Sequence, residues 1–511
     1  MTRNCVDYAE VSDESDSWED LNDEYKSKPK KRKKTNNVEG QSSSSSENVE
    51  DKDNGKKKAK QRVIRNLVKV TVGKKAADKT KRRNQLKEET EEETELDYEE
   101  EYEEEDIAVS EQTAKKQEEL KTWKLGGWKT DKRIERFIPG PHLNDQSADL
   151  FEDDSIIDYL FMFMPIEYIK DVMLPATNDY AKANGWDEKP YTFDDFINFL
   201  GLMYMMGVVR LPERRMYWST EPDGIFPGLN FGRIMSIHRF ETFLNVWQLS
   251  GEEDMNVQVL DFIHAVNQRL KESMRAGPIL CVDESMIKSY HRHLNGKMKI
   301  IRKPRPIGNE LKTVSDAKTH IVLHMELHEA KEEMADKDYV KEYGATTACC
   351  LRITEHWKGS GRVVVGDSWF GSVKTCKQLL NQNGLYANML VKTAHKEYPR
   401  HLLRDTKLKR GEWVCANARI EETDLLATRF IDLQEKLFIS TRSTSLPGPL
   451  RRTKYHGDVQ RPQVSFEYLL ASASIDIHHH FRTGSVGLED SWKTKNSNMR
   501  QVIRDLFSID V

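Results

Sequence analysis

Cysteine is scarce in this chain of 511 residues, and its spacing excludes the common small zinc modules. The six cysteines contain no C-x-x-C pair, although Cys349 and Cys350 are adjacent. Zinc modules of that kind take their thiolate ligands from such pairs, so none is expected. In a reducing compartment we also expect no disulfide framework, and we interpret the cysteines as free, mostly buried thiols.

Long apolar runs are missing as well. The sequence has no uninterrupted apolar stretch of the roughly eighteen residues that a membrane helix requires. The first residues also lack the charged and then apolar pattern of a secretion signal. We therefore expect no membrane partner and a location inside the cell.

Periodic apolar positions are almost absent from the first 136 residues, which are charged and rich in serine. Such a segment buries too little apolar surface to offset the entropy lost on ordering, so we expect residues 1–136 to be a disordered charged arm. Within it, "KPKKRKK" (Lys28 to Lys34) resembles a nuclear import signal and predicts a nuclear location. A merely solvated run of charges is the alternative.

The net charge of -5 conceals two blocks of opposite sign in this arm. Residues 56–87 hold fourteen Lys or Arg and a single acid, Asp78, which favours binding to phosphates or acidic proteins. Residues 88–106 hold fourteen Asp or Glu and no base. The acidic block is expected to shield the basic one or to contact a basic protein such as a histone.

Helical periodicity dominates residues 137–275, where we expect a helical domain. The segment that begins at Phe193 places its apolar residues along one face, and Thr192 with Asp195 occupies the positions of a capping box. A second segment near residues 232–250 repeats the spacing with Phe240, Phe243 and others.

Short strand-like runs replace the helices after Gly277 and predict a mixed α/β sheet. A helix that ends at Gly384, a favourable C-cap residue, follows four of these runs and precedes another. We expect this core over residues 276–400, a smaller insertion domain of strands over 401–462, and a last helical part of the core over 463–511.

Three aspartates are the candidate catalytic and metal-binding residues. Asp283 and Asp367 end two apolar strands, where open α/β sheets commonly place ligands, and Asp476 lies on the later helix. Each one alone is more simply a turn former or a helix cap. Together, three carboxylates repel one another unless divalent cations neutralise them, and a pair of such ions supports phosphodiester chemistry.

Several ordered blocks of the chain resemble the piggyBac transposases and the host proteins derived from them. The similarity covers roughly residues 137–511 and lies in the stretches "FINFLGLMYMMGVVRLPERRMYWS", "GRIMSIHRFETFLNVWQLS", "CVDESMIKSYHR", "IRKPRPIGNELKTVSDAKTHIVL", "GDSWFGS", "RGEW" and "TRFIDLQEKLFIST". So many blocks in the same order make the resemblance specific.

The resemblance implies a ribonuclease H-like core interrupted by an insertion domain and preceded by a helical domain for dimerisation and DNA binding. It places the family's catalytic, metal-binding aspartates at Asp283, Asp367 and Asp476. It further implies Mg²⁺ or Mn²⁺ as the cofactor, transposon ends or chromatin DNA as the partner, a homodimer, and cleavage followed by strand transfer.

The chain departs from the family pattern near the third aspartate. Ala473 and Ser474 replace two glycines, and His479 replaces an acidic residue. The family's cysteine-rich zinc module has no counterpart after Asp476, which predicts weaker recognition of specific DNA ends. These departures favour the alternative of a domesticated, inactive protein that binds DNA or chromatin. A third alternative is an adaptor that acts only through its charged arm.

Other residues near the aspartates have weaker assignments. Lys303 and Arg305 are candidate DNA-phosphate contacts, although solvation explains them equally well. Trp369 and Phe370 directly follow a buried strand, so we expect them in the core below the site rather than stacked on bases. The run His478 to His480 is expected to be a partly exposed surface trio, because consecutive helical residues point in different directions.

Overall fold

The structure is a computed structural model that describes residues 122–130, 156–186, 189–222, 225, 228–288, 296–299, 307–393, 395–453 and 457–481. All of them belong to one compact unit, Asp106–Val511. The import-like cluster, the basic and acidic blocks, Lys303 and Arg305 lie outside the described residues.

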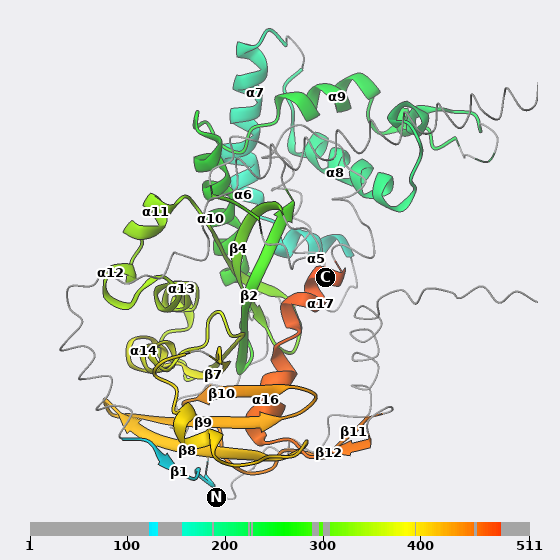
Figure 1. The fold of residues 1–511 in the computed structure, drawn as a ribbon. Coiled ribbons are helices and arrows are strands. Elements are labelled where there is room, and N and C mark those ends of the chain that lie inside the picture. The colour runs from blue at the N-terminus through cyan, green and yellow to red at the C-terminus, as the bar shows by residue number, and fades with distance from the viewer. Residues whose placement is uncertain are drawn as a thin grey trace, which may run out of the picture. The chain divides into compact units, whose positions relative to one another are not determined.

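The first part of the described chain is helical (Figure 1). Its elements are α5 (Ile156–Phe163), α6 (Ile166–Tyr168), the π-helical turn η3 (Ile169–Met173), α7 (Leu174–Ala183), α8 (Phe193–Val208), the 3-10 turns η4 (Arg214–Trp218) and η5 (Phe231–Arg233), α9 (Ile237–Val246) and α10 (Met255–Ser273). The sequence analysis did not identify α10, whose buried face packs against strand β5 (Val322–Leu327).

Aromatic side chains bind α8 to α9, as their spacing predicts. Phe199 stacks on Phe240 at 4.8 Å between ring centroids and meets Phe243 edge-on at 5.0 Å. Trp247 lies 5.5 Å from Phe199, and all four rings are fully buried. Aromatic pairs in these geometries add to the free energy gained by burial.

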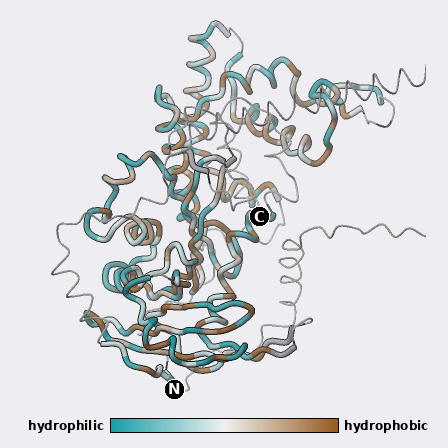
Figure 2. The backbone as a smooth tube through the Cα atoms, viewed as in Figure 1, coloured by the Kyte–Doolittle hydropathy of each residue, from teal (hydrophilic) through white to brown (hydrophobic). Residues whose placement is uncertain are grey.

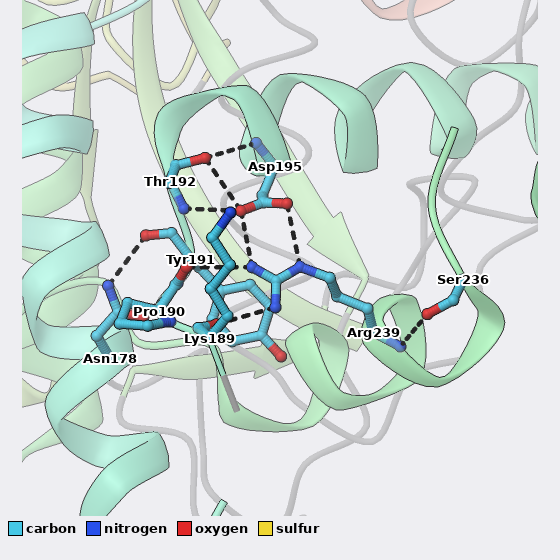
Figure 3. Close-up of polar contacts among 8 residues, drawn as sticks. All are labelled: Asn178, Lys189, Pro190, Tyr191, Thr192, Asp195, Ser236 and Arg239. Carbon is cyan, nitrogen blue, oxygen red and sulfur yellow. Dashed lines mark hydrogen bonds and ion pairs between the residues drawn. The ribbon is translucent and has the colours of Figure 1, made fainter. Parts of the chain in front are cut away.

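The start of α8 is fixed by the predicted capping box, which also receives an arginine from α9 (Figure 3). The Asp195 amide donates to the Thr192 hydroxyl, and the Thr192 amide donates to the Asp195 carboxylate at 2.9 Å. Arg239 donates from Nε and Nη2 to the two oxygens of that carboxylate, at 3.1 and 2.8 Å. Its guanidinium also stacks on Tyr191, 4.4 Å from the ring centroid.

A ten-stranded mixed sheet forms the second part. Its strands follow the order β1 (Lys124–Leu125), β8 (Trp413–Ile420), β9 (Thr423–Ile431), β10 (Glu435–Ser440), β7 (Tyr386–Leu390), β6 (Val363–Gly366), β2 (Ile279–Lys288), β4 (Ile307–Asp316), β3 (Lys297–Lys299), and β5 also pairs with β4. The central pairs β2–β6 and β6–β7 are parallel, and the others are antiparallel. Strands β11 (Arg451–Thr453) and β12 (Gly457–Val459) form a separate hairpin.

Helices cover both faces of this sheet (Figure 1). On one face, α13 (Ala345–Ile353) contacts β4 and β5, and α14 (Val373–Asn383) contacts β7 and β9. On the other face, α16 (Gln463–Ala471) contacts β6 and β7, and α17 (Ser474–Phe481) contacts β2 and β4. The remaining short helices are α11 (Lys331–Asp336), α12 (Val340–Tyr343), the 3-10 turn η6 (Glu355–Trp357) and α15 (Arg400–Arg404).

Alternate residues of the central strands supply two hydrophobic cores. Val364 faces the larger core, which includes α10 and α13, whereas Val363 and Val365 face a smaller core with Tyr468 and Ile475. This follows from the two-residue period of a strand. Figure 2 shows hydrophobic and hydrophilic stretches interspersed along the helices and strands.

Residues 122–130 correct one end of the predicted arm. Strand β1 pairs with β8 through Lys124 and Asn417, and Trp123 is buried. The expectation of disorder up to residue 136 is therefore wrong for this segment. A strand of two residues carries no sequence periodicity, which explains why it was missed.

Five cysteines are confirmed as free and buried: Cys281, Cys349, Cys350, Cys376 and Cys415. Cys5 lies outside the described residues. Separately, none of the helices in the described part of the chain is long and apolar enough to cross a membrane.

Candidate functional site

Asp283 and Asp367 lie side by side next to the pairing of the two central parallel strands. Asp283 is within β2, which continues to Lys288, so the expectation that it ends its strand is wrong, whereas Asp367 directly follows β6 as expected. Val282 of β2 pairs with Gly366, the last residue of β6, and each aspartate follows its strand partner directly. Both carboxylates are half-buried. Parallel pairing therefore brings together two acidic groups that are far apart in sequence, as the sequence analysis expected for this pair.

A tight turn holds Asp367 in place. Its Oδ1 accepts a hydrogen bond from the Trp369 amide at 2.8 Å, and its carbonyl accepts one from the Gly371 amide at 3.0 Å. A Cβ atom at Gly371 would lie 1.7 Å from the Leu390 carbonyl oxygen of β7, so only glycine fits there. Ser372 then caps α14.

Glu284 is the third carboxylate of the group, and the sequence analysis did not select it. Among the described residues, one carboxylate oxygen from each of Asp283, Glu284 and Asp367 lies within 4.8 Å of the other two. The Glu284 amide also donates to Asp283 Oδ1 at 2.8 Å, which turns the Asp283 side chain toward its neighbour. The "DES" tripeptide was the only signal in the sequence.

Asp476 lies on the first turn of α17 and is exposed. It is not a member of the group formed by Asp283, Glu284 and Asp367. It nevertheless belongs to the helix on the same side of the sheet as Asp283, because Cys281, which shares a strand face with Asp283, packs with Ile475 of α17. Burial and the carboxylates of Asp283 and Asp476 raise the pKa of the Cys281 thiol.

Side-chain contacts attach α17 to β2 and to the end of β4. The Ser474 hydroxyl donates to the Asp316 carbonyl at 2.9 Å, and the ring of His479 contacts the Ser285 hydroxyl. His478 is buried, with 2% of its surface exposed, so the expectation of a surface histidine trio is wrong at that position. Its burial follows from its place on α17, which packs on β2 and β4, one helical turn after the buried Ile475.

Lys312 is a buried cation beside the acidic group. It pairs directly with Glu284 across β2 and β4, and its Nζ lies 3.5 Å from Glu284 and 3.3 Å from Glu310. Burial lowers the pKa of Lys312, but the Glu310 and Glu284 carboxylates outweigh that effect and raise it, so the ammonium stays charged.

Aromatic rings lie beside Lys312 on one face of the sheet and near the aspartates on the other. Lys312 Nζ lies 3.2 Å from the centroid of Trp369, and Phe370 is fully buried against Trp369. Both residues are in or beside the core, as predicted. On the opposite face, burial together with Asp367, Cys281 and Asp283 raises the pKa of Tyr468 on α16.

The donors of this group suit a hard divalent cation. Carboxylate oxygens are the preferred ligands of Mg²⁺ and Mn²⁺. The oxygens of Asp283, Glu284 and Asp367 converge within 4.8 Å, and no thiol or imidazole belongs to this group. The residues therefore fit the metal that the resemblance implies.

A mixed sheet whose two central parallel strands bring two aspartates together, with a helix packed beside them, is a ribonuclease H-like fold. A family model described as "Transposase IS4" matches residues 157–507. The chain belongs to this family of piggyBac-type transposases.

A solved structure shares the fold. The cryo-EM structure of a piggyBac transposase synaptic complex with hairpin DNA superposes with a TM-score of 0.58 at 15% sequence identity, and covers 73% of this chain and 76% of the other. The predicted ribonuclease H-like fold is thereby confirmed. No curated protein matches the chain.

Proposed function

We propose that this protein is a DDD-type transposase that cleaves DNA and transfers the resulting 3'-hydroxyl with Mg²⁺ or Mn²⁺. The observation that supports it best is the convergence of Asp283, within β2, and Asp367, just after the adjacent strand β6. Membership in the transposase family supports the same function.

In this proposal Asp283 and Asp367 hold the metal, and Asp476 contributes from α17. A divalent cation bound by these residues would activate a water or a 3'-hydroxyl and would stabilise the leaving oxygen of a phosphodiester. The chain's own contribution is position: two strands and the Gly371 turn fix the carboxylates. Folding has already fixed these groups in place. The reaction therefore does not have to restrict them again, which lowers its activation free energy.

The partners follow from the same proposal. DNA ends are the substrate, Lys303 and Arg305 contact phosphates, and the helical segment of residues 137–275 binds DNA and dimerises. The basic cluster at Lys28 to Lys34 supports a nuclear location, and the acidic block of residues 88–106 supports a histone contact.

The test is strand cleavage by the purified full-length protein with Mg²⁺ on DNA that carries the ends of its own element. We expect nicking and joining, and a loss of about 100-fold or more in Asp283→Asn and Asp367→Asn. Asp336→Asn is the control, because that carboxylate is exposed on α11 and pairs only with exposed Lys341 among the contacts that are described. An inert wild type, or full activity in Asp283→Asn, contradicts the proposal.

A domesticated protein that binds DNA without cutting it is the second candidate. It is favoured by the exposed position of Asp476 outside the acidic group. Such a protein binds DNA with strong salt dependence and without help from the carboxylates. We then expect the triple variant Asp283→Ala, Asp367→Ala, Asp476→Ala to bind as well as the wild type, while neither cleaves.

A further inference from the structure

Glu284 and Asp283 leave β2 on opposite faces, because they are consecutive residues of one strand. Their carboxylates nevertheless meet: each contributes an oxygen to the group within 4.8 Å that includes Asp367. The Glu284 side chain is only 3% exposed, whereas Asp283 and Asp367 are half-buried. Glu284 therefore reaches the group from inside the sheet.

A buried carboxylate costs several kcal/mol unless it is paired, and Lys312 supplies the pairing. The ammonium lies 3.5 Å from Glu284, and the Lys312 side chain is itself only 3% exposed. Because Glu284 and Lys312 are direct partners in the antiparallel register, the sheet fixes the separation of their backbones. Trp369 covers the ammonium at 3.2 Å, which leaves it little room to move.

Glu310 completes the cluster from the other side. Its carboxylate lies 3.3 Å from the same ammonium and is as deeply buried as that of Glu284. Glu310, however, does not belong to the group of Asp283, Glu284 and Asp367. Glu284 and Glu310 thus share the Lys312 ammonium, and of these two buried glutamates only Glu284 reaches the acidic group.

We propose that Glu284 is a ligand of the divalent cation together with Asp283 and Asp367, and that Lys312 is the positioning residue that holds its carboxylate at the site. This inference rests on the proposed metal-dependent function. Lys312 also partly neutralises the acidic group, so the carboxylates remain close together before a cation enters. Its pairing with Glu310 keeps the ammonium from being drawn fully toward Glu284.

The test is the affinity of the full-length protein for Mn²⁺ alone, measured by the electron paramagnetic resonance signal of free Mn²⁺, without DNA. We expect Glu284→Gln to weaken binding about 10-fold or more, in the range seen when a group that tunes a metal site is removed. Glu310→Gln is the matched control, because it removes the other partner of Lys312 at the same burial. We expect that variant to stay within about threefold of the wild type.

Equal losses of Mn²⁺ affinity in Glu284→Gln and Glu310→Gln would overturn the inference. They would show that the affinity depends on the pairing of Lys312 and not on ligation by Glu284. Unchanged Mn²⁺ affinity in Glu284→Gln would overturn it as well. Glu284→Asp keeps the charge opposite Lys312 but shortens the side chain, and we expect weaker Mn²⁺ binding there even if Glu284→Gln does not fold. Wild-type protein that binds Mn²⁺ but never cleaves DNA contradicts the proposed function alone.

Discussion

Val282 of β2 pairs with Gly366 of β6 in a parallel register, and Asp283 and Asp367 are the residues that directly follow this pair. Two side chains separated by a long stretch of sequence are thereby brought together in the middle of the sheet. Their approach depends on this register, since a shift of one residue turns one carboxylate to the opposite face, and on the turn that holds Asp367. The backbone that follows Asp367 is consequently as important to the site as the carboxylates themselves.

We expect Gly371→Ala to destabilise the protein by about 3 kcal/mol or more, the upper range for overpacked interiors. The added Cβ would meet the Leu390 carbonyl oxygen at 1.7 Å, and the backbone of the turn must move. Urea unfolding measures the change. Mn²⁺ affinity should fall in the same variant, because the turn that carries Asp367 shifts.

Gly201→Ala is the control for that substitution. Gly201 lies in α8, is exposed, and a Cβ there meets no atom within 4 Å. Alanine in an unobstructed helix position should raise the free energy of unfolding by about 0.5–1 kcal/mol. Equal destabilisation by the two alanines would show that the close approach at Gly371 has no energetic importance.

Asp195→Asn should cost about 1.5–3 kcal/mol of unfolding free energy, because charged hydrogen bonds from Arg239 are weakened. Partial burial raises the pKa of Asp195, but the hydrogen bonds from Arg239 and Thr192 outweigh it and lower the pKa from 3.8 to about 2. Because the folded pKa is the lower one, this contribution is complete above about pH 4 and is lost as the pH falls toward 2. Urea unfolding at a series of pH values should show the difference between wild type and variant shrinking over that range.

The control is Asp336→Asn, in a pair with Lys341 whose side chains are both 82% exposed. Exposed pairs contribute little, so its effect should stay within about 0.5 kcal/mol. A difference between wild type and Asp195→Asn that stays constant from pH 5 to pH 2 would contradict the assignment of this ion pair as the source.

Local chemistry made much of the fold predictable from the sequence. Thr192 and Asp195 form the expected capping box, Gly384 ends α14 in the left-handed region at φ 61°, and the apolar runs around Asp283 and Asp367 are central strands. These features depend on neighbours within a few residues. The resemblance to a family supplied the long-range arrangement that such features do not contain.

The features that the sequence did not predict depend on strand register and on the packing of α17 against the sheet. Glu284 was not selected, and consecutive residues of a strand point to opposite faces, so no local pattern joins it to Asp283; the folded structure brings their carboxylates together. The contact of Lys312 with Glu284 requires the β2–β4 register. His478 is buried because of where α17 packs, which no local pattern encodes.

The five buried cysteines should react with a thiol reagent at pH 8 only when the protein unfolds. Burial raises the pKa of all five thiols, to about 11 at Cys415 and about 12 at Cys349. The thiolate is the reactive form, and burial also blocks access. A Cys5→Ala variant isolates these thiols, and its labelling rate should follow the urea dependence of global unfolding. Rapid labelling of any of the five in native conditions would contradict their burial.

Variants that weaken the contacts between α17 and the sheet should separate the role of Asp476 from the roles of Asp283 and Asp367. Ser474→Ala removes the hydroxyl that donates to the Asp316 carbonyl, and His479→Ala removes the contact with Ser285. We expect the double variant to lose about 1–3 kcal/mol of unfolding free energy and to exchange the α17 amides faster, with α14 unchanged as the internal control.

In that double variant, DNA cleavage should fall about 10-fold or more, because Asp476 is carried by α17 and a loosely held catalytic group is poorly oriented. Mn²⁺ affinity should change by less than about threefold, because Asp283, Glu284 and Asp367 are all on or next to the central strands. If cleavage is unaffected while the α17 amides exchange freely, Asp476 has no part in the reaction, and the two central aspartates with Glu284 form the complete carboxylate set.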